Sequence, residues 1–333
     1  MLDFSIGRSF GLMARTLPFI LMRLAVYFGI LCAYVIATGA GAAIGWGVGG
    51  LGDQTARAIS AFWGGAIGFG LTAVILVLLR EYILYVVKAG HIAVLVELLD
   101  GQALPDGKGQ IAHAKEVVSA RFLETSVLFA VDQLIKGVLG AITGLIQGIA
   151  SFLPIPGVRQ IMGIVRAFLR VSIGLVDEVI LAHAIRTRSD NPWASARVAL
   201  VLYGQNAGPL FKNAAVLTIL VYGLSILVFL VMLTPATALA YLMPGAWSAG
   251  GILIALLFAW AVKAAIIEPF AIACMLQAFF RLTDGQTPDP AWDARLSRAS
   301  KKFNRIKEKS GLWIPAGPAA AAPSNDLVLE HRT

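Results

Sequence analysis

Uncharged apolar runs separated by short polar turns set the pattern of this chain. The longest run extends from Asn213 to Val262 and contains no Asp, Glu, Lys, Arg or His. A bilayer core is about 30 Å thick, and roughly 20 apolar residues of helix cross it. The run therefore predicts two membrane crossings, with a break at Thr234-Pro235 and Met243-Pro244-Gly245.

The remaining apolar runs predict an all-α, polytopic membrane protein. Its expected parts outside the bilayer are a basic cytoplasmic lead (1–16), a cytoplasmic helical hairpin (about 80–134), an amphipathic helix (281–310) and a disordered tail (311–333). Four residues of the lead are apolar enough for a membrane surface: Phe4, Phe10, Leu12 and Met13. We expect six transmembrane helices, at about 17–49, 61–79, 137–158, 161–184, 213–236 and 251–280. Of these, 137–158 is either a short span or a re-entrant segment.

The helical pattern does not stop at the end of the second span. A helix from Ala58 to Leu99 would be about 60 Å long, twice the thickness of the hydrocarbon core, so its second half should project from the membrane. Asp100-Gly101 then predicts a turn. In the alternative, 82–99 is a separate span, and Lys88 and His91 would lie at mid-membrane, where they cost several kcal/mol unless paired. The hairpin is the preferred interpretation.

Glycines recur at helical spacing in the first two spans. Gly41, Gly45 and Gly49 lie in the first, and Gly64, Gly68 and Gly70 lie in the second. Small residues at this spacing let helix backbones approach closely where lipid supplies no hydrophobic drive. Helix packing is favoured over a permeation path as their role.

The segment 290–309 predicts a basic amphipathic helix. Asp289 can cap it, and Pro290 suits its first turn. Apolar residues recur at i, i+4, i+7, i+11 and i+14: Trp292, Leu296, Ala299, Phe303 and Ile306. Basic residues suited to an anionic inner leaflet fill the remainder: Arg295, Arg298, Lys301, Lys302, Arg305, Lys307 and Lys309.

Composition and charge agree with a membrane protein. Of the 333 residues, 58% are hydrophobic and only 14% charged, and the net charge is +8. The predicted inner loops 80–121 and 183–212 and the tail hold five, four and nine Lys or Arg, whereas the outer loops hold only Arg57 and Arg159. This bias predicts an inner-membrane protein with both termini in the cytoplasm. A nucleic-acid partner is not expected, because the basic residues form no aromatic-interleaved domain.

Motifs of soluble enzymes are absent from the sequence. It holds no P-loop, no Gly-x-Ser-x-Gly, no His-Glu-x-x-His and no metal-spaced cluster of Cys or His. The adjacent carboxylates Asp177 and Glu178 point about 100° apart on a helix, so they cannot share a substrate as an acid/base pair. We expect no catalytic activity, no metal and no cofactor.

Ionisable residues near the membrane give the best functional indication, because they usually face a bundle interior or a watery cavity. The candidates are Arg166, Arg170, Asp177, Glu178, Lys263 and Glu268. In one hypothesis, Lys263 or Glu268 faces the charged wall of 161–184 and forms a polar centre. In the other, the arginines snorkel outward, Asp177, Glu178 and His183 lie at the cytoplasmic rim, and Lys263 only satisfies one of them. For Arg23, snorkelling to the inner face is favoured.

The polar turn Tyr203-Gly204-Gln205-Asn206 interrupts an otherwise apolar stretch, as turns do where backbone lines a cavity or gate. Together with Lys212-Asn213-Ala214, it resembles a segment of choline transporter-like membrane proteins that reads Tyr-Gly-x-Asn and then, five residues on, a basic residue and Asn-Ala. Thr283-Asp284-Gly285, Pro290-Ala291-Trp292 and the basic helix follow in a similar order. The resemblance covers about 158–309.

The sequence and this resemblance together predict a transporter or permease for a small solute, an organic cation or a lipid-related molecule. Its path would be lined by seven residues: Tyr203, Asn206, Asn213, Asp177, Glu178, Lys263 and Glu268. The alternative is a non-transporting membrane scaffold or accessory subunit that binds a cytoplasmic partner or anionic lipids. The expected surroundings are the bilayer, anionic lipids at the cytoplasmic face and either further copies of the chain or a membrane complex.

Overall fold

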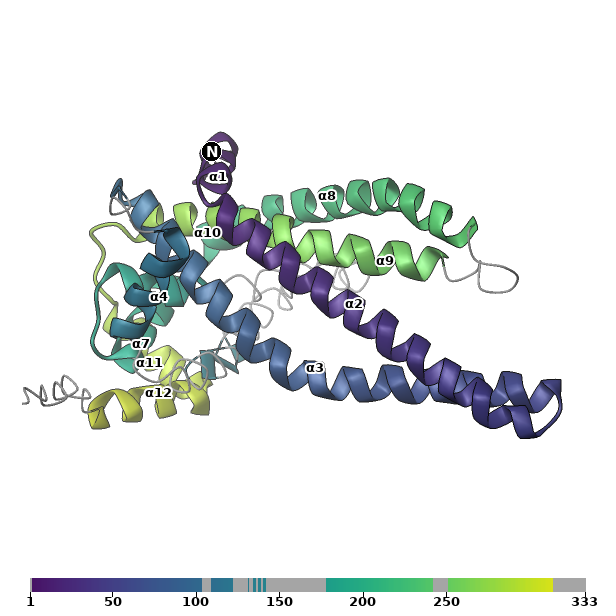
Figure 1. The fold of residues 1–333 in the computed structure, drawn as a ribbon. Coiled ribbons are helices and arrows are strands. Elements are labelled where there is room, and N and C mark those ends of the chain that lie inside the picture. The colour runs from purple at the N-terminus through teal and green to yellow at the C-terminus, as the bar shows by residue number, and fades with distance from the viewer. Residues whose placement is uncertain are drawn as a thin grey trace, which may run out of the picture.

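The computed structural model describes residues 2–103, 109–121, 178–241 and 251–313, together with seven positions between 131 and 141. Every regular element in these ranges is a helix. Two long helical pairs, α2 with α3 and α8 with α9, extend from a group of shorter helices (Figure 1). The α2–α3 turn and the neighbouring ends of α8 and α9 lie at one end of the molecule, opposite α7, α11 and α12 (Figure 1).

The first pair is formed by α2 (Leu17–Val48) and α3 (Gln54–Leu99), joined through the short helix η1 (Gly49–Leu51). Asp53 caps α3, because its side chain accepts a hydrogen bond from Ala56 N at 2.7 Å. The helix ends in a Schellman motif, in which Gln102 N donates to Glu97 O and Gly101 adopts a positive φ of 76°. The predicted long helix and its turn at Asp100-Gly101 are thus confirmed.

Glycine contacts bring α2 and α3 together. A side-chain carbon added at Gly41, Gly45, Gly64 or Gly68 would meet backbone atoms of the other helix at less than 3.0 Å, and one at Gly49 would lie 2.7 Å from Arg57 Cα. Close packing is therefore confirmed at these positions. Gly70 was expected to take part as well, but it faces open space, because it lies on another side of α3.

The second pair consists of α8 (Ala207–Tyr241) and α9 (Gly251–Val262). The predicted break at Thr234-Pro235 is wrong, because α8 continues through Pro235, and the predicted break at Met243-Pro244-Gly245 lies outside the described residues. α9 continues through the π-helix η3 (Lys263–Ile267) into α10 (Glu268–Thr283). The wide turn has a local cause: Pro269 lacks an amide hydrogen and its ring crowds the preceding turn. Glu268 N donates instead to Lys263 O, five residues back.

Within the described part of the chain, four helical segments are long and apolar enough to cross a membrane: Leu17–Leu51, Gln54–Leu76, Ala207–Pro235 and Leu256–Thr283. They correspond to four of the six predicted spans, and these segments fit a membrane-embedded protein. Most of the other two predicted spans, 137–158 and 161–184, lies outside the described residues, although 178–184 is described as helix.

The shorter helices surround a common core. Residues 92–96 of α3 and 270–280 of α10 are buried in it, and α4 (Gln110–Arg121) packs on α3. Most of the predicted hairpin beyond α4 lies outside the described residues. α1 (Ile6–Arg15) packs on α10. Phe4, Leu12 and Met13 are buried there, so of the four apolar residues expected on a membrane surface, only Phe10 is exposed.

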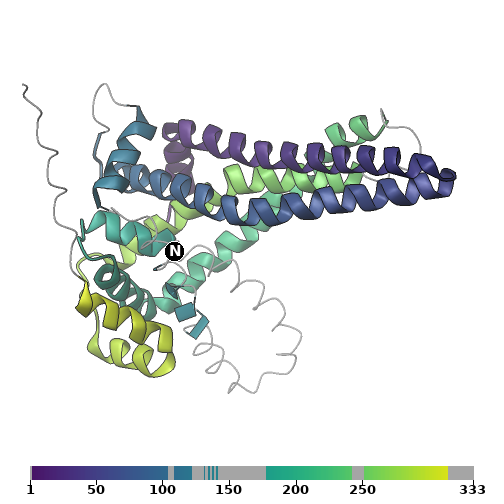
Figure 2. The ribbon, with the colours of Figure 1, turned by 60° about the horizontal axis from the view of Figure 1, so that its bottom comes forward.

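The C-terminal segment forms two helices where one was predicted. Asp289 caps α11 (Pro290–Ala299) as expected, accepting from Ala291 N at 2.8 Å, and α12 (Lys301–Leu312) follows. Ser300 breaks the helix with extended backbone and caps α12 by accepting from Phe303 N at 3.3 Å. The fully buried apolar residues Leu296, Phe303 and Ile306 belong to the protein core, and both helices contact α7 (Pro192–Gln205) (Figure 2).

This packing corrects the amphipathic-helix prediction, because the apolar side of the segment is used inside the protein. The basic side remains exposed, at Arg295, Arg298, Lys301, Lys302 and Arg305. Its contact with anionic lipid stays a prediction that rests on charge alone.

Candidate functional site: a buried charged centre

Arg23 lies six residues into α2 and is 1% exposed. Phe19 and Tyr27, one turn before and after it, are buried as well, so this side of α2 faces the protein. None of the three guanidinium nitrogens has a hydrogen-bond partner among the described residues. The prediction that Arg23 snorkels to the inner face is therefore wrong, because its side of the helix is covered by protein.

Lys88 of α3 brings a second cation to this region. Its Nζ lies 2.7 Å from Oε1 of Glu178, which is 4% exposed and begins the described part of the helix Glu178–Arg186. The distance is that of a charge-assisted hydrogen bond. A charge in this part of α3 was expected to be costly unless it is paired, and Glu178 is the partner of Lys88.

Lys263 and Glu268 come from the second pair, at the two ends of the π-helix. Lys263 Nζ lies 3.9 Å from Glu268 Oε1, and both side chains are about one-third exposed, at 36% and 33%. Glu268 is also within electrostatic range of Arg23, Lys88 and Glu178. Glu268 therefore joins the charge of its own helix to those of α2 and α3.

His91, one turn after Lys88, adds a neutral group. Its Nε2 lies 2.9 Å from Thr16 Oγ1, and because that hydroxyl already donates to Leu12 O at 2.9 Å, Nε2 is the donor. Nδ1 is buried without a partner among the described residues. Burial, and next the charge of Arg23, hold the pKa of His91 well below its usual value, so the ring is neutral at pH 7.

These residues form what we call the charged centre: Arg23, Lys88, His91, Glu178, Lys263 and Glu268. It contains three basic residues and two acidic ones, so the formal charge of its described members is +1. Buried charge near a membrane is costly unless it is paired, and it usually marks a path for ions or polar solutes. The arrangement can bind or pass on a charged group. The described residues contain no cluster of ligands suited to a metal ion.

The polar turn at Tyr203 lies apart from this centre, at the junction of α7 and α8. Tyr203 is 1% exposed, and burial raises the pKa of its hydroxyl. Asn206 Nδ2 donates to Gln286 Oε1 at 2.7 Å. An added Cβ at Gly204 would lie 3.1 Å from Trp292. The turn thus joins the α7–α8 junction to the segment that follows α10.

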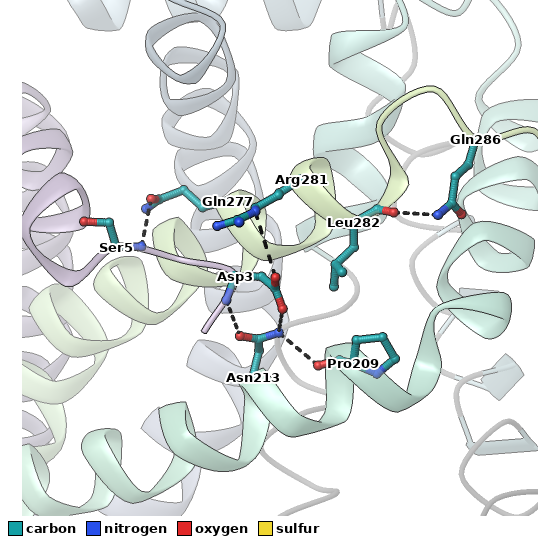
Figure 3. A network of polar contacts seen from close by, with 8 residues as sticks. All are labelled: Asp3, Ser5, Pro209, Asn213, Gln277, Arg281, Leu282 and Gln286. Atoms are coloured by element: carbon teal, nitrogen blue, oxygen red, sulfur yellow. Dashed lines mark hydrogen bonds and ion pairs between the residues drawn. The ribbon is translucent and has the colours of Figure 1, made fainter. Parts of the chain in front are cut away.

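Asn213 fixes the N-terminal lead. Its Oδ1 accepts from Asp3 N at 2.9 Å, and its Nδ2 donates to Asp3 Oδ2 at 2.7 Å and to Pro209 O at 2.9 Å (Figure 3). The side chain is fully buried. Asn213 is therefore a clamp between α8 and residue 3.

The structure divides the predicted path residues into two groups. Glu178, Lys263 and Glu268 meet in the charged centre, where Lys263 pairs within its own helix segment. Tyr203, Asn206 and Asn213 form structural contacts elsewhere, and Asp177, Arg166 and Arg170 lie outside the described residues. The path role of Tyr203, Asn206 and Asn213 stays a prediction.

Sequence reasoning did not assign Arg23, Lys88 and His91 to the site. A signal was present for Arg23, which shares one side of α2 with Phe19 and Tyr27 at a spacing of four residues. Lys88 and His91 are three residues apart and likewise share a side of α3.

No family model, curated protein or solved structure matches this chain. The resemblance of 158–309 to choline transporter-like proteins therefore stays a prediction.

Proposed function

We propose that this chain is a six-span inner-membrane permease, with both termini in the cytoplasm, that moves a small polar solute past the charged centre. The observation that carries the proposal is the burial of Arg23, which places a guanidinium without a described hydrogen-bond partner among charges from three other parts of the chain. A protein gains no stability from such a group. A polar path is the use that accounts for it.

The π-helix between Lys263 and Glu268 supports this proposal. Wide turns of this kind are frequent at functional sites. Here the turn separates two charges on a span that contacts both α2 and α8. The predicted resemblance to choline transporter-like proteins adds an organic cation or a lipid-related molecule to the solutes worth testing.

Flux into proteoliposomes tests the proposal. Purified protein is screened against amines, organic cations, organic anions and lipids, and we expect flux of at least one class. Arg23→Gln should lower that flux at least tenfold, and Arg23→Lys should retain part of it. The matched control is Arg298→Gln, an exposed arginine of α11. Absence of flux for every class, or equal flux in Arg23→Gln, would falsify the permease.

A scaffold is the second candidate, and the exposed basic side of α11 and α12 favours it. Because their apolar side holds them on α7, these helices present fixed positive charge to an anionic lipid surface. Phosphatidylglycerol should then raise the melting temperature of the purified protein more than phosphatidylcholine does. The difference should vanish when five residues are changed to Gln: Arg295, Arg298, Lys301, Lys302 and Arg305. A stable co-purifying partner without flux would also favour the scaffold.

A further inference from the structure

A cavity of about 380 Å³ lies where the N-terminal lead meets the ends of α3 and α10. Its volume falls within the range of about 300–1,000 Å³ for small-molecule sites. Phe4 and Phe280 contribute apolar walls. Its charged walls comprise three arginines and three aspartates: Arg8, Arg186, Arg281, Asp3, Asp100 and Asp284.

Two of the six charged residues form a closed pair. Arg186 Nη2 lies 2.9 Å from Asp100 Oδ1, and Arg186 Nε donates to Asp100 Oδ2 at 3.2 Å. The guanidinium carbon also lies 4.4 Å from the ring centre of Phe280. Because these two side chains bind each other, they form part of the cavity wall and do not serve as ligand-binding groups.

The other two arginines keep most of their donors. Arg8 donates one Nη2 hydrogen to Leu99 O at 2.9 Å, and Arg281 Nε lies 3.9 Å from Asp3 Oδ1, beyond hydrogen-bond distance (Figure 3). A guanidinium has five N–H groups. The remaining ones have no acceptor among the described residues, and they are suited to a carboxylate or phosphate.

The carboxylate of Asp284 is also available. Asp284 ends α10, three residues after Arg281, and among the described residues nothing forms a hydrogen bond or ion pair with its side chain. Asp3, in contrast, is held by Asn213 at 2.7 Å, and Ser5 N donates to Gln277 Oε1 at 3.3 Å (Figure 3). The lead is thereby fixed as a wall, and Asp284 is left as the acceptor for a ligand.

We propose that this cavity binds a small zwitterion of the amino-acid type, with its anionic group on Arg8 and Arg281 and its ammonium group on Asp284. The charges of the three arginines and three aspartates in the wall cancel. A ligand with a single charge therefore gains little from the net electrostatic potential of the cavity. A dipolar ligand meets an opposite charge at each end. The site is independent of the proposed flux, because it lies beside the lead and not in the charged centre.

Calorimetric titration of the full-length protein in detergent tests this site. The probes are glycine, β-alanine and 4-aminobutyrate, whose charges are increasingly far apart, with propionate and propylamine as single-charge controls. We expect saturable binding of at least one zwitterion, at least tenfold tighter than either control. Binding of none of the three, or equal binding of propionate or propylamine, overturns the proposal.

Variants assign the two ends of the ligand. Arg281→Gln and Asp284→Asn change exposed side chains, so the fold should be kept, and each should weaken zwitterion binding at least tenfold. Arg298→Gln changes an exposed arginine of α11 that does not line the cavity, and it should leave binding unchanged. Arg23→Gln separates this site from the permease, because it should lower the flux at least tenfold and keep zwitterion binding. Unchanged binding in both cavity variants would show that the site lies elsewhere.

Discussion

The two membrane hairpins are held together by different contacts. α2 and α3 meet backbone to backbone at Gly41, Gly45, Gly64 and Gly68, whereas Gly208 and Gly223 of α8 both face open space. Close backbone contact leaves no room for adjustment, while side-chain packing can shift. The first hairpin is therefore held by backbone contact at these glycines, whereas Gly208 and Gly223 of α8 make no such contact.

The charged side chains of the two hairpins also differ, in how deeply they are buried. Arg23 and His91, from the first, are fully buried, whereas Lys263 and Glu268, from the second, are about one-third exposed and flank a π-helix. A change in the first hairpin should therefore cost more than the matching change in the second. We expect this order for substitutions that disturb packing, for substitutions that remove an ion-pair partner and for the pH dependence of stability.

The largest expected effect is that of packing. Gly64→Leu would drive a side chain into the backbone of α2, and because backbone cannot move aside as a side chain can, the cost should exceed the usual 1–3 kcal/mol of overpacking and reach about 4 kcal/mol. Gly223→Leu should cost less than about 0.5 kcal/mol. Thermal unfolding in detergent measures both.

Gly70→Leu is the control within the first hairpin, because Gly70 faces open space on the same helix as Gly64. It should unfold close to the wild-type temperature. If Gly64→Leu were as stable as Gly70→Leu, the backbone contact would not hold this hairpin together.

The next effect is that of the ion pairs. Glu178→Gln removes the partner of Lys88 beside Arg23 and should cost about 3 kcal/mol, since a buried charge is left unpaired. Glu268→Gln should cost less than about 1 kcal/mol, because the Lys263 pair is longer and partly exposed. Denaturant or thermal midpoints compare the two variants.

A double variant distinguishes the pair from its neighbours. Lys88→Met combined with Glu178→Gln should be more stable than Glu178→Gln alone, because the unpaired charge is gone. Equal loss of stability in the single and double variants would show that Glu178 acts through other contacts.

The smallest effect is that of pH. His91 has a lowered pKa in the folded protein, while in the unfolded chain it titrates near 6.5. The stability that comes from keeping it neutral is therefore fully present above about pH 6.5 and declines as the pH falls below that value. Melting temperatures between pH 7.5 and 5.5 should fall less in His91→Gln than in the wild type. The slope is the readout, so an unchanged slope would contradict the role of His91 even if the variant is less stable.

Periodic patterns in the sequence predicted the long elements well. The uncharged run from Asn213, the glycine repeats and the turn at Asp100-Gly101 each reflect a local rule of helix length, packing or capping. The break at Ser300 was missed, because basic and apolar residues continue across it at helical spacing. Only the contact of α11 and α12 with α7 shows that the apolar residues serve the core.

The charged centre was predictable only in part. The rarity of charge in spans pointed to Glu178, Lys263 and Glu268, but which charge meets which depends on how α2, α3 and α10 cross. Lys88 was expected outside the membrane, and its partner Glu178 lies 90 residues further along the chain. Sequence spacing carries no information about a contact of that separation.

The length of α3 has a mechanical consequence. Its 46 residues form one helix of about 69 Å that begins at the hairpin turn and ends at Leu99, in the wall of the cavity beside the lead. Pivoting such a rod by about 5° at its outer end moves the other end by about 6 Å. Bilayer thickness alters the tilt of spanning helices. Because Leu99 is part of the cavity wall, any change in the tilt of α3 would also change the width of the cavity.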